Sequence, residues 1–219
     1  MIVIVPSRGR PERAAAMVKS ASETAQGSVR IVVAVDPDDE QLEEYRRVIG
    51  DLIVLPERLG YSRSLNIVAY QEWDHEDILG AFGDDVLFRT RGWDHKVRKA
   101  LATPGIAFGD DLAHHGSHPT AVWMSTPIAK ALGWLALPDC HHQYVDNAWW
   151  ELGNALGLLR YLPDVVVEHM HPAYQKAELD DTYRSVYSMP QAGIDHAAFM
   201  AWRETRLAKD VARVQEALA

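Results

Sequence analysis

Short apolar runs recur along the chain and form its clearest pattern. These runs are Ile2–Val5, Ile31–Val35, Leu52–Leu55, Ile78–Phe82, Gly105–Phe108 and Val165–Val167. Runs of this length without polar alternation are typical of strands buried on both faces. Three stretches between the early runs carry apolar positions at helical spacing, namely Glu12–Ser22, Glu40–Ile49 and Ser64–Trp73. The alternation predicts an α/β fold, with a Rossmann-like, mostly parallel sheet flanked by helices.

The second half of the chain has a weaker pattern. Residues 109–122 are mainly polar and predict a loop, and a short helix is expected over 127–132, ended by Gly133. A strongly apolar helix is expected over Asp146–Leu156. The tail, His196–Ala219, keeps helical spacing throughout and predicts one continuous C-terminal helix.

Composition and charge narrow the class of protein. The chain has 219 residues, of which 47% are hydrophobic and 24% charged, values typical of one globular domain. The chain has 31 acidic and 22 basic residues, which gives a net charge of −9. This charge repels a phosphate backbone, so no nucleic-acid groove is expected. The only cysteine is Cys140, which excludes an internal disulfide. No segment has the roughly 20 apolar residues of a membrane span, and no signal peptide is recognisable, so we expect a cytoplasmic protein.

Polar residues follow the predicted strands at the sheet edge where α/β proteins bind ligands. These strand ends read Pro6-Ser7-Arg8-Gly9-Arg10, Asp36-Pro37-Asp38-Asp39 and Gly83-Asp84-Asp85. The guanidinium groups of Arg8 and Arg10, next to a helix N-terminus, suit an anionic ligand. An ordinary solvated turn is the alternative explanation for this segment alone.

The pair Asp84-Asp85 is the sharpest of these signals. Two carboxylates about 4 Å apart repel each other by roughly 4 kcal/mol at an effective dielectric of 20, so a bound cation stabilises them. Mg²⁺ and related hard ions take one or two carboxylates together with substrate phosphates. Asp110-Asp111 follows a similar apolar run and is the competing candidate.

Two further candidates lie late in the chain. His169 and His171 alternate after the last apolar run, so on a strand both imidazoles would face one ion. Asp146 begins the apolar helix, where a carboxylate is stabilised by the helix dipole. It is either a helix cap or a general base whose orientation the helix fixes.

Taken in this order, the motifs resemble those of nucleotide-sugar-dependent glycosyltransferases with the GT-A fold, family 2 type. The resemblance spans roughly residues 2–183. It rests on the PSRGRP turn, on Asp36 after the second strand, on Gly83-Asp84-Asp85 at the position of the Asp-x-Asp motif, and on the segment WMSTPIAKALGWL. The later segment EHMHPAYQKAELDDTYR is similar to bacteriophage-encoded members.

The resemblance implies a role for each matched residue. It implies donor contacts from Pro6, Ser7, Arg8, Arg10, Asp36, Arg63, Asn66, Asp84, Lys176 and Tyr183. It implies that Asp85 and His169 bind a divalent cation, Mn²⁺ or Mg²⁺, with His171 as a second candidate ligand. Asp146 matches the position of the family's catalytic carboxylate.

The implied activity is metal-dependent transfer of a sugar from a UDP- or GDP-sugar to a free hydroxyl of a glycan or protein, with inversion of the anomeric centre. The implied organisation is a single catalytic domain over residues 1–195, with a nucleotide-binding half over 1–100 and an acceptor half over 101–195. Residues 196–219 then form the C-terminal helix, which is a candidate contact for a homo-oligomer or packs on its own domain.

Three alternatives stay open at this point. A nucleotidyltransferase would use similar carboxylates on a nucleoside triphosphate, but the sequence lacks a glycine-rich phosphate loop containing lysine. A non-catalytic nucleotide-sugar-binding module would need neither Asp146 nor His169. A histidine-based metallohydrolase would bind metal without nucleotide affinity.

Overall fold

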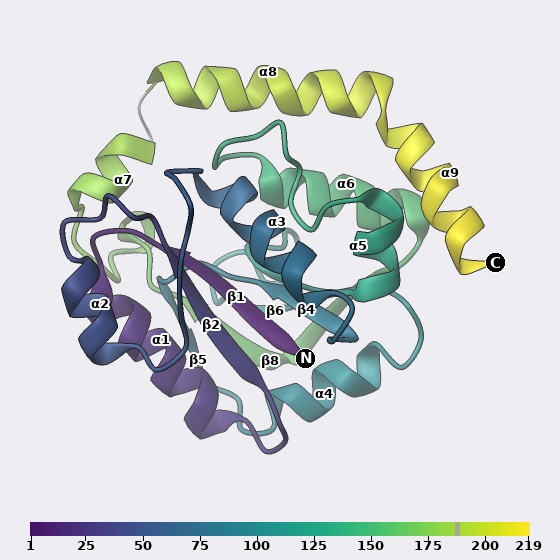
Figure 1. The fold of residues 1–219 in the computed structure, drawn as a ribbon. Coiled ribbons are helices and arrows are strands. Elements are labelled where there is room, and N and C mark those ends of the chain that lie inside the picture. Colours follow the sequence, from purple (N-terminus) through teal and green to yellow (C-terminus); the bar gives the residue numbers. More distant parts are fainter. Residues whose placement is uncertain (187–188) are drawn as a thin grey trace.

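The computed structural model describes residues 1–186 and 189–219. A central sheet lies between helices on both of its faces (Figure 1). Its strands are β1 (Ile2–Ser7), β2 (Arg30–Val35), β3 (Leu52–Val54), β4 (Ile78–Ala81), β5 (Val86–Phe88), β6 (Ile106–Asp110), β7 (Val122–Ser125) and β8 (Leu159–His169). The helices are α1 (Pro11–Thr24), α2 (Leu42–Val48), α3 (Tyr61–Glu72), α4 (Trp93–Ala100), α5 (Thr126–Leu132), α6 (Val145–Leu156), α7 (Asp181–Val186), α8 (Met189–Thr205) and α9 (Leu207–Leu218), with a 3₁₀ turn at Pro172–Tyr174.

The strand order in the sheet is β3-β2-β1-β4-β7-β6-β8-β5. Parallel pairing joins β3, β2, β1 and β4, and it also joins β6 to β8. Antiparallel pairing joins β7 to both of its neighbours and β5 to β8. The predicted α/β class with a mostly parallel sheet is therefore confirmed.

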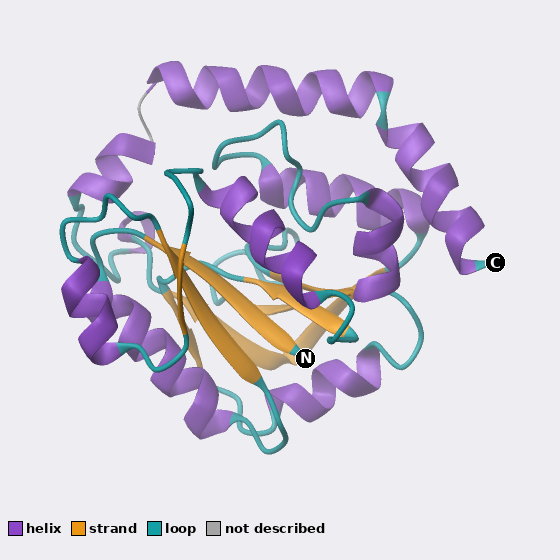
Figure 2. Ribbon diagram, in the orientation of Figure 1, coloured by secondary structure: helices purple, strands orange, loops and turns teal. Residues whose placement is uncertain are grey.

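Two apolar layers cover the two faces of this sheet. Along β1, Ile2 and Ile4 pack into one layer, whereas Val3 and Val5 pack into the other. This alternation follows from the two-residue period of a strand, and burial on both faces explains why the run contains no polar residue. One layer is covered by α3, α5, α6, α8 and α9, and the other by α1, α2 and α4 (Figure 2).

All six predicted strands are present, but the apolar runs did not reveal the two short antiparallel strands β5 and β7. The helix α4 was also not predicted. No helix in residues 1–186 and 189–219 has the length and hydropathy needed to cross a membrane.

The prediction of one continuous helix over 196–219 is wrong. The chain breaks at Arg206, between α8 and α9, and α9 turns to pack against α5 and α6 (Figure 1). Across the break, the indole N–H of Trp202 donates to Asp210 Oδ2 at 2.9 Å, and the Trp202 side chain is fully buried. A straight helix over the predicted span would be about 36 Å long and would carry Val211 and Val214 away from the core. The tail therefore docks on its own domain.

A buried carboxylate on α8 holds the irregular chain that precedes α6. Asp195 is fully buried and accepts hydrogen bonds from the backbone N–H groups of His141, His142 and Gln143 at 2.8–2.9 Å. The side chain of Gln191 donates a fourth, at 2.9 Å. Burial would raise the pKa of this carboxyl, but the backbone donors outweigh it, so the pKa of Asp195 lies below its usual value.

We predict that Asp195→Ala lowers the free energy of unfolding by about 3 kcal/mol, because three partly buried N–H groups lose a charged acceptor. Urea denaturation at pH 7 measures the effect. Asp164→Ala, at an exposed position of β8, is the matched control and should change stability by less than about 0.5 kcal/mol.

The same contact predicts a pH dependence. The folded pKa of Asp195 is depressed relative to an unfolded value of about 3.9, so its stabilisation is complete above that pH and is lost as the pH falls below it. The stability gap between the wild type and Asp195→Asn should therefore narrow below about pH 4. A gap that stays constant down to acid unfolding would contradict this assignment.

Candidate functional site

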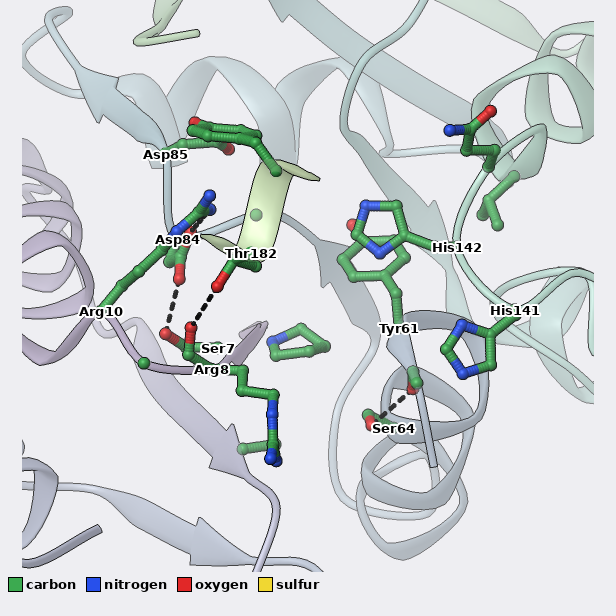
Figure 3. Close-up of a pocket in the computed structure, with 18 of the residues that line it drawn as sticks. Ser7, Arg8, Arg10, Tyr61, Ser64, Asp84, Asp85, His141, His142 and Thr182 are labelled. Carbon is green, nitrogen blue, oxygen red and sulfur yellow. Dashed lines mark hydrogen bonds and ion pairs between the residues drawn. The ribbon is translucent and has the colours of Figure 1, made fainter. Parts of the chain in front are cut away.

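A pocket of about 1120 Å³ opens at the carboxyl ends of β1, β2 and β4. This is the edge at which α/β sheets bind ligands, because the strand ends and helix N-termini meet there. Figure 3 shows its side chains in two groups, with Ser7, Arg10 and Asp84 in one and Tyr61, His141 and His142 in the other. The ends of β1 and β4 therefore supply charged and hydroxyl groups to the pocket, and the opposite side supplies aromatic and imidazole rings.

Ser7 links the end of β1 to the end of β4. Its hydroxyl donates to Asp84 Oδ2 at 2.6 Å and lies 2.6 Å from the hydroxyl of Tyr45, a buried side chain of α2. The Tyr45 oxygen also accepts from the backbone N–H of Arg10 at 2.8 Å. These hydrogen bonds fix the PSRGRP turn against the Asp84-Asp85 pair before any ligand binds.

Arg10 connects this turn to the late segment around α7. Its guanidinium contacts Asp84 Oδ1 at 3.2 Å and binds both oxygens of Asp180 at 2.7 and 2.9 Å. The guanidinium carbon also lies 3.8 Å from the centre of the Tyr183 ring. The paired hydrogen bonds with Asp180 and the contact with the Tyr183 ring both hold the planar guanidinium, so Arg10 is fixed at the pocket edge.

Asp85 lies against the end of β8. Its Oδ2 accepts from the Tyr183 hydroxyl at 2.9 Å and lies 3.4 Å from Nε2 of His169. Asp85 lies beside His169 because β5 and β8 pair in an antiparallel ladder. This ladder sets Val86 opposite His169, and the N–H of Met170 donates to the Asp85 carbonyl at 2.7 Å. The ladder thus sets the distance between two residues that are 84 positions apart in the sequence.

Burial and charge separate the two neighbouring carboxyls. Burial, and then the charge of Asp85, raises the pKa of Asp84. Burial also acts to raise the pKa of Asp85, but the neighbouring His169 and the Tyr183 hydroxyl outweigh it and lower that pKa. Burial acts to lower the pKa of His169, and the contact with Asp85 raises it more. Asp85 therefore favours the protonated form of His169, and His169 favours the ionised form of Asp85.

The same pair has the donor set for a divalent ion. Carboxylate oxygen and imidazole nitrogen are both ligands of Mn²⁺-type ions, and His169 Nδ1 is buried without a hydrogen-bond partner in the part of the chain the structure describes. No group of three or more His, Cys, Asp or Glu residues within that part is arranged to hold a metal. An ion on Asp85 and His169 would therefore complete its shell with waters and ligand oxygens, as Mg²⁺ usually does.

Asp146 faces the same pocket from the first turn of α6. Its Oδ1 accepts from the backbone N–H of Asn147 at 2.9 Å, and its Oδ2 lies 3.1 Å from Nε2 of His118. Tyr144, with φ of +64°, precedes the helix and provides no side-chain cap. Asp146 is therefore not the N-cap, and its carboxylate is held at the helix N-terminus, where negative charge is favoured.

The group opposite Ser7 consists of aromatic rings, and one of them, His142, is uncharged at neutral pH. The rings of Tyr61 and His142 lie 5.2 Å apart, and burial lowers the pKa of His142 to about 4. His141 packs over Gly60, which has φ of +76°. This side of the pocket presents hydrogen-bonding groups and ring faces rather than fixed charge.

Most of the predicted site residues meet at this pocket. Those that line it are Pro6, Ser7, Arg8, Arg10, Asp36, Asp84, Asp85, Asp146, His169, His171 and Tyr183. The competing pair, Asp110-Asp111, binds the loop that follows it through the N–H groups of residues 112–114.

Three expected donor contacts are not brought to the pocket. Arg63 is exposed on α3 and is not part of the described lining. The amide of Asn66 is buried and bonded to the backbone of residues 135 and 136 at 2.7–2.9 Å, so it holds that segment in place. Lys176 pairs with Glu168 at 2.8 Å, because that carboxylate is its near neighbour on β8.

The expectation that His169 and His171 lie on the same face of one strand is also wrong. The strand β8 ends at His169, and His171 lies in the following turn, where its Nδ1 accepts from the N–H of Ala173 at 3.1 Å. The two ring centres are nevertheless 5.1 Å apart. Both rings reach the pocket from consecutive elements rather than from one strand.

Several residues of the site were missed. Asp180 forms an adjacent acidic pair with Asp181 in the sequence. His118 is one of three histidines in the 109–122 loop. Those clusters were the available signals. Tyr45 lies within a predicted helix and Asp195 directly precedes another, and neither position gave a signal.

No protein-family model matches the sequence, and no curated protein sequence matches it significantly. Among solved structures, the chain is similar to a mannosyltransferase from Pyrobaculum calidifontis in complex with GDP-Man and Mn²⁺, at 14% identity and a TM-score of 0.62, over 99% of this chain and 73% of that one. It is also similar to glucosyl-3-phosphoglycerate synthase from Mycobacterium tuberculosis in complex with Mn²⁺, UDP-Glc and phosphoglyceric acid, at 12% identity and 0.64, over 93% and 79%.

A third similar structure is the catalytic domain of Drosophila β1,4-galactosyltransferase 7 in complex with xylobiose, at 12% identity and a TM-score of 0.55, over 86% of this chain and 79% of that one. At these identities the comparisons establish the fold. The chain therefore has the GT-A fold of these glycosyltransferases.

The pocket geometry gives a test that does not depend on function. We predict that Gly60→Ala lowers the free energy of unfolding by about 1–3 kcal/mol, because its backbone, with φ of +76° and ψ of 171°, lies in a region essentially restricted to glycine. An added Cβ would also approach His141 Nε2 within 2.4 Å. Gly50→Ala is the control, since a Cβ there meets no atom within 4 Å. Equal denaturation midpoints for the two variants would refute the prediction.

Proposed function

We propose that the protein is a metal-dependent glycosyltransferase that moves a sugar from a nucleotide-sugar donor to an acceptor hydroxyl. The observation that carries the proposal is the convergence of the β1 turn, the Asp84-Asp85 pair, His169 and Asp146 on one pocket in a chain with the GT-A fold. Similar structures hold GDP-Man or UDP-Glc together with Mn²⁺, which supports the same donor class here.

The donor nucleotide is proposed to lie along the ends of β1 and β2. Asp36 there is available to the base or ribose, and it accepts from Arg8 at 3.1 Å. Arg8 and Arg10 bring positive charge to the side where the diphosphate lies. Tyr183 and Asp84 complete this side, and Asp84 is the candidate ribose contact.

Asp85 and His169 are proposed to hold the divalent cation, Mn²⁺ or Mg²⁺, with His171 as a further candidate. When bound, the cation supplies Lewis-acid stabilisation of the negative charge that develops on the leaving diphosphate. The Tyr183 hydroxyl now bonded to Asp85 and the Arg10 guanidinium lie beside that position, so both can stabilise the same charge.

Asp146 is proposed to be the general base. It would accept the proton of the acceptor hydroxyl while the acceptor oxygen bonds to the anomeric carbon and the bond from that carbon to the diphosphate oxygen breaks. The nucleoside diphosphate then leaves, and attack from the opposite face inverts the anomeric centre. A carboxylate oxygen within reach of the acceptor hydroxyl can take its proton directly, which suits Asp146 to this role.

We predict that Asp146→Asn lowers turnover by about 10²–10⁴-fold while donor affinity is retained, because the amide keeps the shape but cannot accept the proton. Release of UDP or GDP from the cognate sugar nucleotide measures turnover, and calorimetry measures donor affinity. Asp139→Asn is the matched control, since its carboxylate is equally exposed, at 39% against 38% for Asp146, but pairs with Arg206. Unchanged turnover in Asp146→Asn would exclude its role as the base.

We also predict that donor binding and turnover depend on a divalent ion through Asp85. In a thermal-shift screen with UDP, GDP, CDP and dTDP, the wild type should be stabilised by one nucleotide more strongly with Mn²⁺ than without it. Asp85→Asn should lose the Mn²⁺-dependent part, whereas Asp110→Asn, in the competing acidic pair, should keep it. Full activity in excess EDTA would contradict the metal assignment.

A further inference from the structure

His118 contacts Asp146 from a different part of the chain. It belongs to the loop between β6 and β7, and its Nε2 lies 3.1 Å from Asp146 Oδ2. Its side chain is 20% exposed, against 38% for Asp146, and it is not part of the described pocket lining. The imidazole therefore contacts the carboxylate without belonging to the described pocket lining.

The loop that carries His118 is tied down by a second carboxylate. Asp111 accepts from the backbone N–H groups of Ala113 and His114 at 2.9 and 2.7 Å, from His114 Nδ1 at 2.8 Å and from the Thr120 hydroxyl at 3.2 Å. The carbonyl of Asp111 also accepts from the N–H of His169 at 3.1 Å, which joins this loop to β8.

The ring of His118 is itself placed by its neighbours. Its centre lies 5.9 Å from the ring of His114 and 6.1 Å from that of Trp150, which is on α6 one turn after Asp146. These contacts fix the imidazole between the loop and the helix. The arrangement is built for one orientation relative to Asp146, as a residue that acts through another requires.

From this geometry we propose that His118 is a positioning residue for Asp146: the contact of its Nε2 with Oδ2 at 3.1 Å holds the carboxylate toward the acceptor hydroxyl. The inference rests on the proposed function. Oδ1 already accepts from the N–H of Asn147, so this hydrogen bond and the His118 contact together restrict rotation of a half-exposed side chain. The remaining lone pairs are left for the acceptor, whose proton goes to Asp146 while His118 keeps its own.

The experiment measures release of UDP from UDP-glucose and of GDP from GDP-mannose with Mn²⁺, with water or a panel of simple sugars as acceptor. His118→Phe, which keeps a ring but has no donor, should lower kcat by about 10–100-fold and leave the donor KM unchanged, since a misplaced base affects the chemical step. His118→Gln, whose amide nitrogen reaches the Nε2 position, should retain most of kcat. His118→Asn, whose amide ends nearer the Nδ1 position, should behave like the phenylalanine variant.

A double-mutant cycle separates positioning from a general structural effect. If His118 acts through Asp146, the combined variant His118→Phe/Asp146→Asn should be no slower than Asp146→Asn alone. His115→Phe is the control on the same loop, because His115 is 65% exposed and pairs with Asp110 instead. It should leave kcat unchanged.

Three results would overturn the inference: additive losses in the double variant, a change in KM without a change in kcat, or equal activity of the glutamine and asparagine variants. The comparison of glutamine with asparagine decides the matter even if the phenylalanine variant does not fold. If the wild type releases neither nucleotide with any acceptor tested, the proposed function fails first, and the role of His118 falls with it.

Discussion

Asp84 is buried and its neighbour Asp85 is largely buried where β4 gives way to β5, and the cost of burying their charge is the constraint that the rest of the site satisfies. Asp84 is bonded by Ser7 and Arg10, and Asp85 by Tyr183 and His169. These partners come from β1, α7 and β8, so compensating one local charge pair brings together distant parts of the chain. A buried carboxylate without such partners would be protonated instead. The acidic pair therefore acts as an organising centre whether or not a ligand is present.

The opposite side of the pocket meets a different constraint, which is the hydrogen bonding of irregular backbone. The chain between α5 and α6 has little regular structure, and its buried N–H groups need acceptors. Asp195 supplies one for three consecutive residues, and Asn66 supplies another for Leu135 and Ala136. Neither carries out chemistry in the pocket. Asp195 holds residues 141–143, directly before α6, and so helps to place Asp146 in the first turn of that helix. The C-terminal helices are in this way part of the support of the site.

The fold was readable from the sequence where local pattern and final environment agree. Strands buried on both faces are continuous apolar runs, so β1 and β2 were evident, and the tips of parallel strands predicted that Ser7 and Asp84 would meet. The short strand β5 and the break at Arg206 were not evident, because both depend on packing against distant elements rather than on local propensity. Asn66 and Lys176 were misplaced for a related reason. A polar side chain takes the partner that the tertiary structure puts beside it, and sequence order does not reveal that partner.

The pairing of β5 with β8 has an evolutionary consequence. Opposite faces alternate along a strand, so a deletion or insertion of one residue between Val165 and His169 would turn the imidazole to the far side of the sheet and leave Asp85 facing an unrelated side chain. Changes in length within the loop at 111–121 carry no such penalty for this pair, since they leave the ladder in register. Divergent relatives of this chain should therefore conserve the register of β5 and β8 more strictly than the length of the 111–121 loop.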